Sequence, residues 1–224
     1  MSLSIIILVK NLEQIGDSLI SLRGTLRQFK YEICLVYDLA DERTIKELHT
    51  YADLSLIKSN HPGHPGSAIY QGMMMANYKK LVVTMGDGCD NWNDIPEMAN
   101  LLDHFCVVST NRFGSREDYS SGNQYKGWVT RLGAQIFKLA WGWKFNDPTN
   151  NFKAYRKEIL NLICPLNSLG FSIGLEILLK CFVSNLPMTE IHTKWRDDSP
   201  SYLWVKRISS YIPFLLKPKG YSKF

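Results

Sequence analysis

Two aspartates and two glycines that follow one short apolar run are the residues of this chain best suited to chemistry. Residues 81–85 are mostly apolar and include a Val–Val pair, as expected for a buried strand. Gly86, Asp87, Gly88 and Asp90 follow it. Ligands of open α/β sheets gather beyond the carboxyl ends of strands, and a carboxylate pair there suits a hard cation such as Mg²⁺. A plain surface turn is the alternative, because Gly and Asp are common turn residues.

The elements that must position these residues are indicated by apolar runs and helical spacings. Strands are expected at 5–9, 32–37, 54–57, 81–85, 106–110 and 188–195, and helices at 12–29, 44–51, 67–78, 95–105, 128–143 and 170–180. Continuous apolar runs predict strands buried on both faces. Strands that alternate with helices predict a single α/β domain, with a Rossmann-like, mostly parallel central sheet flanked by helices.

Further polar residues follow other predicted strands at the same edge of the sheet. Asp38 closes the strand at 32–37, and a loop rich in Gly, Pro and His leads through Gly66 into the helix at 67–78. Backbone N–H groups at a helix start can bind phosphate. The loop has neither the P-loop nor the GxGxxG spacing, so a turn that leads into a packed helix explains it equally well.

Two arginines and one aspartate in the second half are the remaining candidates. Arg112 follows a predicted strand, Arg131 lies in a predicted helix, and Asp147 precedes a proline and a threonine. A guanidinium binds phosphate through a bidentate fork, and a carboxylate can accept a proton. Arg112 as a plain surface charge and Asp147 as a plain helix cap remain open. Residues 114–125 are polar and aperiodic, and we expect a loop that acts as a substrate lid.

Composition limits the function classes. The 224 residues suffice for one domain with a full core, and a formal charge of +5 suits an anionic partner such as a nucleotide, a phosphate or an anionic membrane surface. We expect no nucleic-acid partner. The five cysteines are odd in number and form no CxxC pair, which predicts reduced thiols in a cytoplasmic protein rather than disulfides or a zinc site.

The C-terminal residues 199–224 differ from the rest and are predicted to form a separate tail. Trp204, Ile208, Tyr211 and Leu215 share one helical face, and lysines and an arginine add positive charge. A basic amphipathic helix can lie on an anionic membrane, which would make the protein peripheral on the inner face. Pro213 interrupts the pattern and favours a helix packed on the core instead. No apolar run approaches the roughly 20 residues that a membrane span requires.

Together these motifs resemble the inverting glycosyltransferases of family 2, which have the GT-A fold, and within them the polyprenyl-phosphate, dolichyl-phosphate mannose synthase-like branch. The resemblance runs from about Ser4 to Arg196. Its most specific match is residues 147–156, which fit the family block Asp-x-Thr-x-x-Phe-x-x-Tyr-Arg. The carboxylates of residues 85–90 are spaced Asp-x-x-Asp, similar to a variant of the common Asp-x-Asp. Further similar segments are 5–13, 35–44, 63–76, 107–112, 170–176 and 190–196.

The resemblance implies a domain over residues 1–198 that transfers a sugar from a nucleotide-diphosphate sugar, with Mg²⁺ or Mn²⁺ on Asp87 and Asp90. Donor-binding residues are implied at strand ends and glycine loops: Val9, Asn11, Glu13, Asp38, Gly66, Gly86, Asp87 and Gly88. Catalytic roles are expected for Asp87, Asp90, Asp147, Arg112 and Arg131.

The acceptor implied by this branch is a polyprenyl phosphate, which is already ionised and needs no strong base. With a saccharide hydroxyl as the acceptor, Asp147 is the candidate base. Two other functions stay open. A sugar-nucleotide nucleotidyltransferase normally has a glycine-rich first loop, and residues 5–13 contain no glycine. A non-catalytic nucleotide-sugar-binding protein is the second, because residues 199–202 are only a reduced form of the family's Gly-x-Ser-Lys signature.

Overall fold

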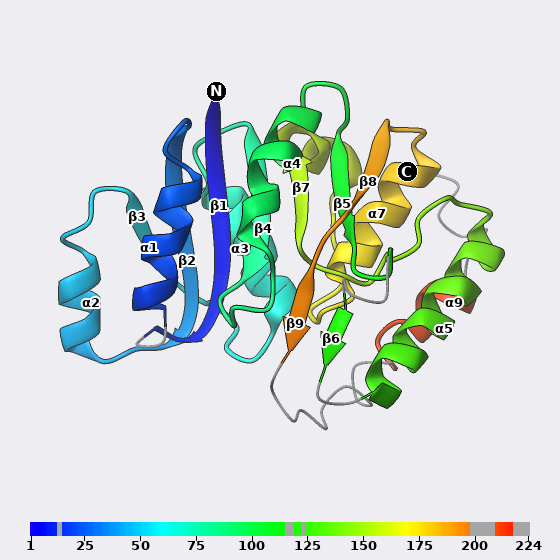
Figure 1. Ribbon diagram of the computed structural model, residues 1–224, viewed down its shortest axis with the longest axis horizontal. Coiled ribbons are helices and arrows are strands. Elements are labelled where there is room, and N and C mark those ends of the chain that lie inside the picture. Colours follow the sequence, from blue (N-terminus) through cyan, green and yellow to red (C-terminus); the bar gives the residue numbers. More distant parts are fainter. Residues whose placement is uncertain (13–14, 115–118, 122–123, 198–208, 217–224) are drawn as a thin grey trace.

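The computed structural model describes residues 1–12, 15–114, 119–121, 124–197 and 209–216. A seven-stranded sheet in the order β3-β2-β1-β4-β7-β5-β8 forms its centre (Figure 1). Its strands are β1 (Ser2–Asn11), β2 (Lys30–Leu39), β3 (Leu54–Lys58), β4 (Lys80–Met85), β5 (Val107–Asn111), β7 (Lys153–Arg156) and β8 (Met188–His192). All neighbours pair in parallel except β7, which runs antiparallel to both β4 and β5. The expected mostly parallel α/β sheet is confirmed.

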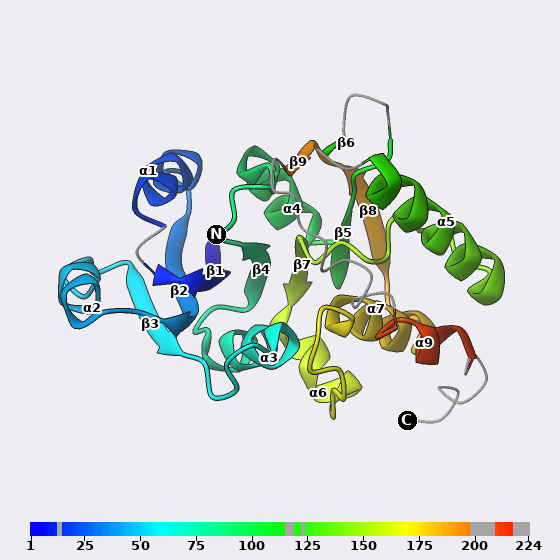
Figure 2. The ribbon, with the colours of Figure 1, turned by 90° about the horizontal axis from the view of Figure 1, so that it is seen from below.

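Helices cover both faces of the sheet (Figure 2). One face carries α1 (Gly16–Thr25) and α4 (Ile95–Leu101), and the other carries α3 (Pro65–Met75), α6 (Leu160–Ile163) and α7 (Ile173–Val183). The short helix α2 (Glu42–Leu48) lies beside β3, whereas α5 (Gln124–Trp141) and α9 (Ile212–Leu216) lie at the β8 end. There are also two short 3₁₀ turns, η2 (Trp92–Asp94) and η3 (Lys157–Ile159).

Two buried clusters result from the alternation of side chains along the strands. On β1, Ile5 and Ile7 pack with α1 and α4, whereas Ile6 and Leu8 pack with α3 and α7. This is the period of two that a strand imposes. The apolar spacing predicted over 12–29 also holds, since its five apolar residues are at most 2% exposed, although α1 is shorter than expected: Leu12, Ile15, Leu19, Leu22 and Leu26.

Three strands were not expected. β7 lies within residues 147–156, and the segment 114–125, expected to be an aperiodic loop, contains β6 (Tyr119–Ser121) and the start of α5. β6 pairs in parallel with β9 (Trp195–Asp197), and the tyrosine and tryptophan rings at the start of the two strands stack at 5.0 Å between centroids. The loop expectation was wrong for these residues because three-residue strands carry no periodicity of their own. The single strand expected at 188–195 is two strands for the same reason.

The described part of the C-terminal tail packs on the domain. Phe214 is buried in the core beside α7, and the Tyr211 hydroxyl donates to the Phe171 carbonyl at 3.3 Å. Pro213 stands in the first turn of α9, where its missing N–H costs nothing. Trp204 and Ile208 lie outside the described residues. Within the described part of the chain, no helix combines the length and apolar character required to cross a bilayer.

Candidate functional site

The sequence-predicted polar residues meet at one edge of the sheet. Because β1 starts at the top of Figure 1 and β2, β4 and β5 follow its direction, their carboxyl ends all lie at the lower edge, together with β6 and β9. Asp38 is on β2, Asp87 and Asp90 follow β4, and Arg112 follows β5. The predicted convergence of these residues at a single edge is therefore confirmed.

The two carboxylates after β4 are each held by one oxygen only. Asp90 is buried, and its Oδ2 accepts hydrogen bonds from the Thr84 hydroxyl at 2.8 Å and the Met85 N–H at 3.2 Å. Asp87 is exposed, and its Oδ1 accepts from the Cys89 N–H at 3.1 Å. Within the described residues, the other oxygen of each carboxylate makes no hydrogen bond. Gly88 permits the loop with a φ of 75°.

The electrostatics of this pair fit a divalent cation. Burial and, to a smaller extent, the nearby charge of Asp87 raise the pKa of Asp90 to about 6, so the two carboxylates are close enough to repel each other. No cluster of three His, Cys, Asp or Glu side chains arranged for a metal occurs among the described residues. Mg²⁺ is often held by one or two carboxylates together with water and substrate phosphates. Two carboxylates, each with an oxygen to spare, therefore match this class of site.

Val9 and Gly86 lie where the loop after β4 packs against the backbone of β1. The Gly86 N–H donates to the Leu8 carbonyl at 2.8 Å, and a Cβ at Gly86 would approach Val9 Cγ2 to 3.0 Å. The glycine thus lets the carboxylate loop lie directly against β1. Asn11 is partly exposed at the end of β1, whereas Glu13 lies outside the described residues.

The loop before α3 is organised by Asp38 and by the chain near residue 169. Asp38 Oδ2 accepts from the Gly63 N–H at 2.9 Å, and Gly63 has a φ of 79°. The Gly66 N–H donates to the Leu169 carbonyl at 2.8 Å, and a Cβ there would collide with neighbouring carbonyls. The phosphate-binding role expected for Gly66 is therefore corrected, because its N–H is already occupied and its lack of a side chain serves close packing.

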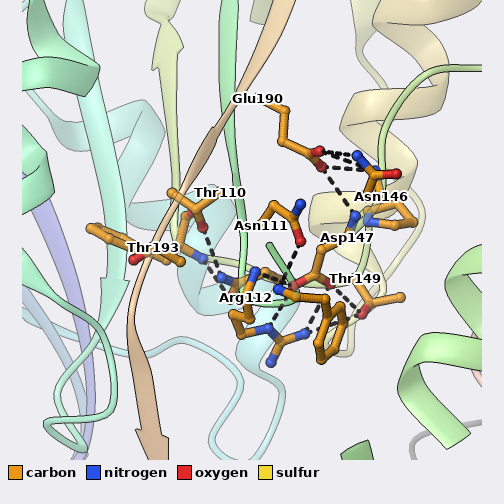
Figure 3. Close-up of polar contacts among 12 residues, drawn as sticks. Thr110, Asn111, Arg112, Asn146, Asp147, Thr149, Glu190 and Thr193 are labelled. Atoms are coloured by element: carbon orange, nitrogen blue, oxygen red, sulfur yellow. Dashed lines mark hydrogen bonds and ion pairs between the residues drawn. The ribbon is translucent and has the colours of Figure 1, made fainter. Parts of the chain in front are cut away.

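Arg112 and Asp147 form a buried bidentate ion pair (Figure 3). Arg112 Nε donates to Asp147 Oδ2 at 2.7 Å and Nη2 donates to Oδ1 at 3.0 Å, while the Thr149 hydroxyl also donates to Oδ1 at 3.2 Å. Burial would raise the pKa of Asp147, but the charge and hydrogen bonds of Arg112 outweigh burial and hold it below its usual value. Both oxygens are occupied, so Asp147 is neither a helix cap nor an available proton acceptor, and Arg112 is not a plain surface charge.

Glu190 on β8 fixes the segment that carries Asp147, and sequence analysis missed it as a site residue. Its carboxylate accepts from the Asn146 N–H at 3.0 Å, the Asn146 side chain at 2.9 Å and the Asp147 N–H at 3.0 Å (Figure 3). A polar residue in a half-buried strand is a weak signal. The role of Glu190 becomes visible only in the structure, where β8 lies beside β5.

Arg131 on α5 packs against Phe113. Its guanidinium stands 5.1 Å from the Phe113 ring centroid, and its buried Nε has no hydrogen-bond partner. It borders a polar cavity of about 510 Å³ whose lining comes from the ends of β5 and β8 and from α5: Asn111, Phe113, Gly114, Arg131, Gln135, Asn146 and His192. The guanidiniums of Arg112 and Arg131 thus share the Phe113 ring, with that of Arg112 5.5 Å from its centroid.

The small sheet of β6 and β9 links the two acidic regions. Trp195 bridges to Asp90, and the Arg196 N–H donates to the Cys89 carbonyl at 3.2 Å. The Arg112 guanidinium stands 5.2 Å from the centroid of the Trp195 indole ring. Consistent with this, the charge of Arg112 lowers the pKa of Asp90, although burial and Asp87 dominate. The carboxylate loop and the ion pair thus form one continuous site.

Comparison with known proteins identifies the family. The profile of glycosyl transferase family 2 matches residues 4–163. The chain belongs to glycosyl transferase family 2. No protein of curated function matches this glycosyltransferase significantly.

Solved structures share the fold of this glycosyltransferase at low identity. Glucosyl-3-phosphoglycerate synthase from Mycobacterium tuberculosis with Mn²⁺, UDP and phosphoglyceric acid is 14% identical, with a TM-score of 0.71 over 96% of this chain and 77% of that one. The same enzyme with phosphoglyceric acid is 15% identical, with a TM-score of 0.72 over 98% and 80%. With Mg²⁺ and UDP it is 14% identical, with a TM-score of 0.68 over 98% and 79%. These values confirm the GT-A fold.

Proposed function

We propose that this family 2 glycosyltransferase moves a sugar from a nucleotide-diphosphate sugar to an acceptor, with Mg²⁺ or Mn²⁺ held by Asp87 and Asp90. One observation carries the proposal: two adjacent carboxylates follow β4, each with an oxygen that no described residue uses. Complexes of the structurally similar synthase with UDP and Mn²⁺ or Mg²⁺ support it. Asp38, two strands away at the same edge, is proposed to contact the nucleotide base.

The cation would act as a Lewis acid that neutralises the diphosphate leaving group. Arg112 adds a fixed positive charge near this point, because its ion pair with Asp147 prevents the side chain from rotating away. Glu190 in turn holds the backbone of Asp147. The chain of contacts Glu190–Asp147–Arg112 therefore orients a guanidinium toward the carboxylate loop before any substrate binds, which lowers the cost of organising the transition state.

The acceptor is proposed to be a polyprenyl phosphate. Asp147 cannot readily take a proton, which favours an acceptor that arrives already ionised. The outward side of α5 also presents four large apolar side chains at helical spacing, each at least 42% exposed: Trp128, Leu132, Ile136 and Leu139. Residues 119–146 contain lysines and an arginine but no Asp or Glu, and the same is true of residues 199–224. A row of exposed apolar side chains in a region with basic but no acidic residues suits an anionic lipid surface.

Turnover assays test the reaction directly. Purified protein is incubated with UDP-, GDP- and dTDP-sugars and with polyprenyl phosphate in vesicles, 3-phosphoglycerate or a saccharide, with Mn²⁺ and with EDTA. We expect transfer to the lipid phosphate that EDTA abolishes. Transfer only to 3-phosphoglycerate or the saccharide would overturn the lipid acceptor. Binding of the donor without transfer to any acceptor would indicate a non-catalytic protein, and sugar-nucleotide formation from a sugar phosphate and NTP would indicate a nucleotidyltransferase.

Vesicle co-sedimentation tests the lipid surface. The triple change Trp128→Ser, Leu132→Ser and Leu139→Ser is expected to abolish binding to vesicles that contain anionic lipid. Ile20→Ser with Leu162→Ser is the control, since both residues are exposed apolar side chains on other elements. Native protein that fails to bind vesicles, and instead dissociates from a dimer to a monomer with the triple change, would assign the row to a second copy of this chain.

A further inference from the structure

Lys10 lies at the carboxyl end of the central strand β1, and neither the sequence motifs nor the site described above assigns it a role. Its side chain is exposed, whereas the seven residues before it are all buried. No ion pair involves it within the described part of the chain. A lysine that ends a buried strand without a partner requires an explanation, because a shorter polar residue would close the strand equally well.

The strand register places Lys10 between the two acidic positions of the site. On one side, it falls between the pairs Val9–Tyr37 and Asn11–Leu39, so it stands opposite Asp38 on β2. On the other side, β1 and β4 are paired as far as Leu8 and Met85, and Lys10 and Asp87 each stand two residues beyond that pair. Neighbouring strands lie about 4.8 Å apart, so Asp38 and the end of β4 are separated by about 10 Å, with Lys10 midway.

Side-chain alternation puts Lys10 on the same face of the sheet as Asp38. Leu8 and Ile6 pack into the cluster with α3, and Lys10 follows them at the spacing of two residues. On β2, Val36 belongs to the same cluster and Asp38 follows it at the same spacing. Asp38 then bonds the Gly63 N–H just before α3, which confirms the direction of that side chain. The ammonium group and the carboxylate of Asp38 therefore border the same part of the edge.

The strand order fixes what must pass over Lys10. In the proposed function, the base lies at Asp38 on β2 and the diphosphate lies at the cation beside β4. Since β1 is the strand between them, the ribose and the α-phosphate must cross its carboxyl end. The two strands beside β1 carry acidic residues at this edge, with Asp38 on β2 and with Asp87 and Asp90 after β4. A compact, flexible cation at the midpoint offers the α-phosphate a charge-assisted hydrogen bond and offsets that negative charge.

We infer that Lys10 is a donor-binding residue that contacts the α-phosphate of the nucleotide, a role that rests on the proposed function. The bond that breaks joins the sugar to the β-phosphate, one phosphate farther from Lys10, and the charge that develops there is proposed to be neutralised at the β4 loop. Loss of its charge should therefore weaken the binding of the donor and raise the KM for the donor, while the KM for the acceptor remains unchanged.

Calorimetric titration with defined nucleotides tests this role. In Mn²⁺ buffer, the native protein is titrated with UDP, GDP and dTDP, and the tightest of the three is taken forward with its monophosphate and its free nucleoside. For Lys10→Met we expect the Kd of both the diphosphate and the monophosphate to rise about tenfold, as for one partly exposed charge-assisted hydrogen bond. The Kd of the nucleoside should not change. Lys10→Arg should keep most of the affinity, since it retains the positive charge.

Lys30→Met is the matched control, because Lys30 is also exposed but lies at the start of β2, at the opposite edge of the sheet. It should bind all three ligands like the native protein. Unchanged diphosphate binding by Lys10→Met would overturn the inference, as would an equal loss for the nucleoside, which would indicate a distorted base site. A native protein that binds none of the three diphosphates would overturn the proposed function itself, and Lys10 with it. Far-UV circular dichroism confirms that each variant is folded.

Discussion

The two acidic regions at the sheet edge use the same side chain in opposite ways. Asp87 and Asp90 stand near each other, and among the residues that the structure describes neither has an ion-pair partner and each keeps one oxygen open. Asp147 has a full set of donors, from the Arg112 guanidinium and backbone and from Thr149. The difference shows that a carboxylate in a motif is available for a ligand only when its lone pairs are unoccupied. The first region keeps carboxylate oxygens available for a ligand, and the second fixes the position of the Arg112 side chain.

The largest effect is expected when the buried ion pair is broken. Asp147→Asn leaves the Arg112 charge without its counterion, in a side chain that is 11% exposed. The free energy of unfolding, measured by urea denaturation, should fall by about 3–5 kcal/mol. The double change Arg112→Met with Asp147→Leu should recover most of this loss, because neither member of the pair is then left buried without its counterion. A stability change below about 1 kcal/mol for Asp147→Asn would contradict the structural role.

In the carboxylate loop, a substitution is expected to reduce activity strongly and to leave stability nearly unchanged. Asp87→Asn should reduce metal-dependent sugar transfer at least about 100-fold, because about 2.7 kcal/mol of leaving-group stabilisation is lost. The free energy of unfolding should change by less than about 0.5 kcal/mol, since the side chain is exposed. Initial rates over a range of Mn²⁺ concentrations and a urea denaturation curve measure both. A variant that remains fully active with the metal chelated would refute the assignment.

The loss of stability at acid pH tests the ion pair of Asp147 in a second way. Because the folded-state pKa of Asp147 is lowered, its contribution to stability is present above the unfolded value of about 3.9 and is lost as the pH falls through the lower folded value. This one group should steepen the acid loss of stability by at most about 1.4 kcal/mol per pH unit. Urea denaturation between pH 5 and about pH 2 measures the free energy of unfolding at each pH. Its loss with falling pH should be steeper in the native protein than in Asp147→Asn by up to this amount.

The smallest change in stability is expected for a second arginine–aspartate pair, which has the same geometry but is less buried. Arg23 and Asp53 form a bidentate pair like Arg112 and Asp147, with distances of 2.8 and 2.9 Å, but their side chains are 25% and 24% exposed. Asp53→Asn should therefore cost about 1 kcal/mol or less, and added salt should reduce the difference. A loss as large as that of Asp147→Asn would show that geometry rather than burial sets the energy.

Local patterns predicted the elements that depend on neighbouring residues. The apolar run at 5–9 gave a doubly buried strand, and the spacing that starts at Leu12 gave the buried face of α1. The role of Asp147 was not predictable in this way, because its partner Arg112 is 35 residues away. β6 and β9 were missed for the same reason, since each is three residues long and its pairing partner is far away in the sequence. Gly66 suggested a phosphate loop until the position of Leu169 was known.

The strand β9 has a mechanical consequence for the site. Its backbone is joined to the carboxylate loop at two points, through Trp195 to Asp90 and through Arg196 to Cys89. The end of β9 at Asp197 therefore lies close to the proposed cation-binding residues. A shift of β9 would therefore be transmitted first to the peptide bonds that set the separation of Asp87 and Asp90.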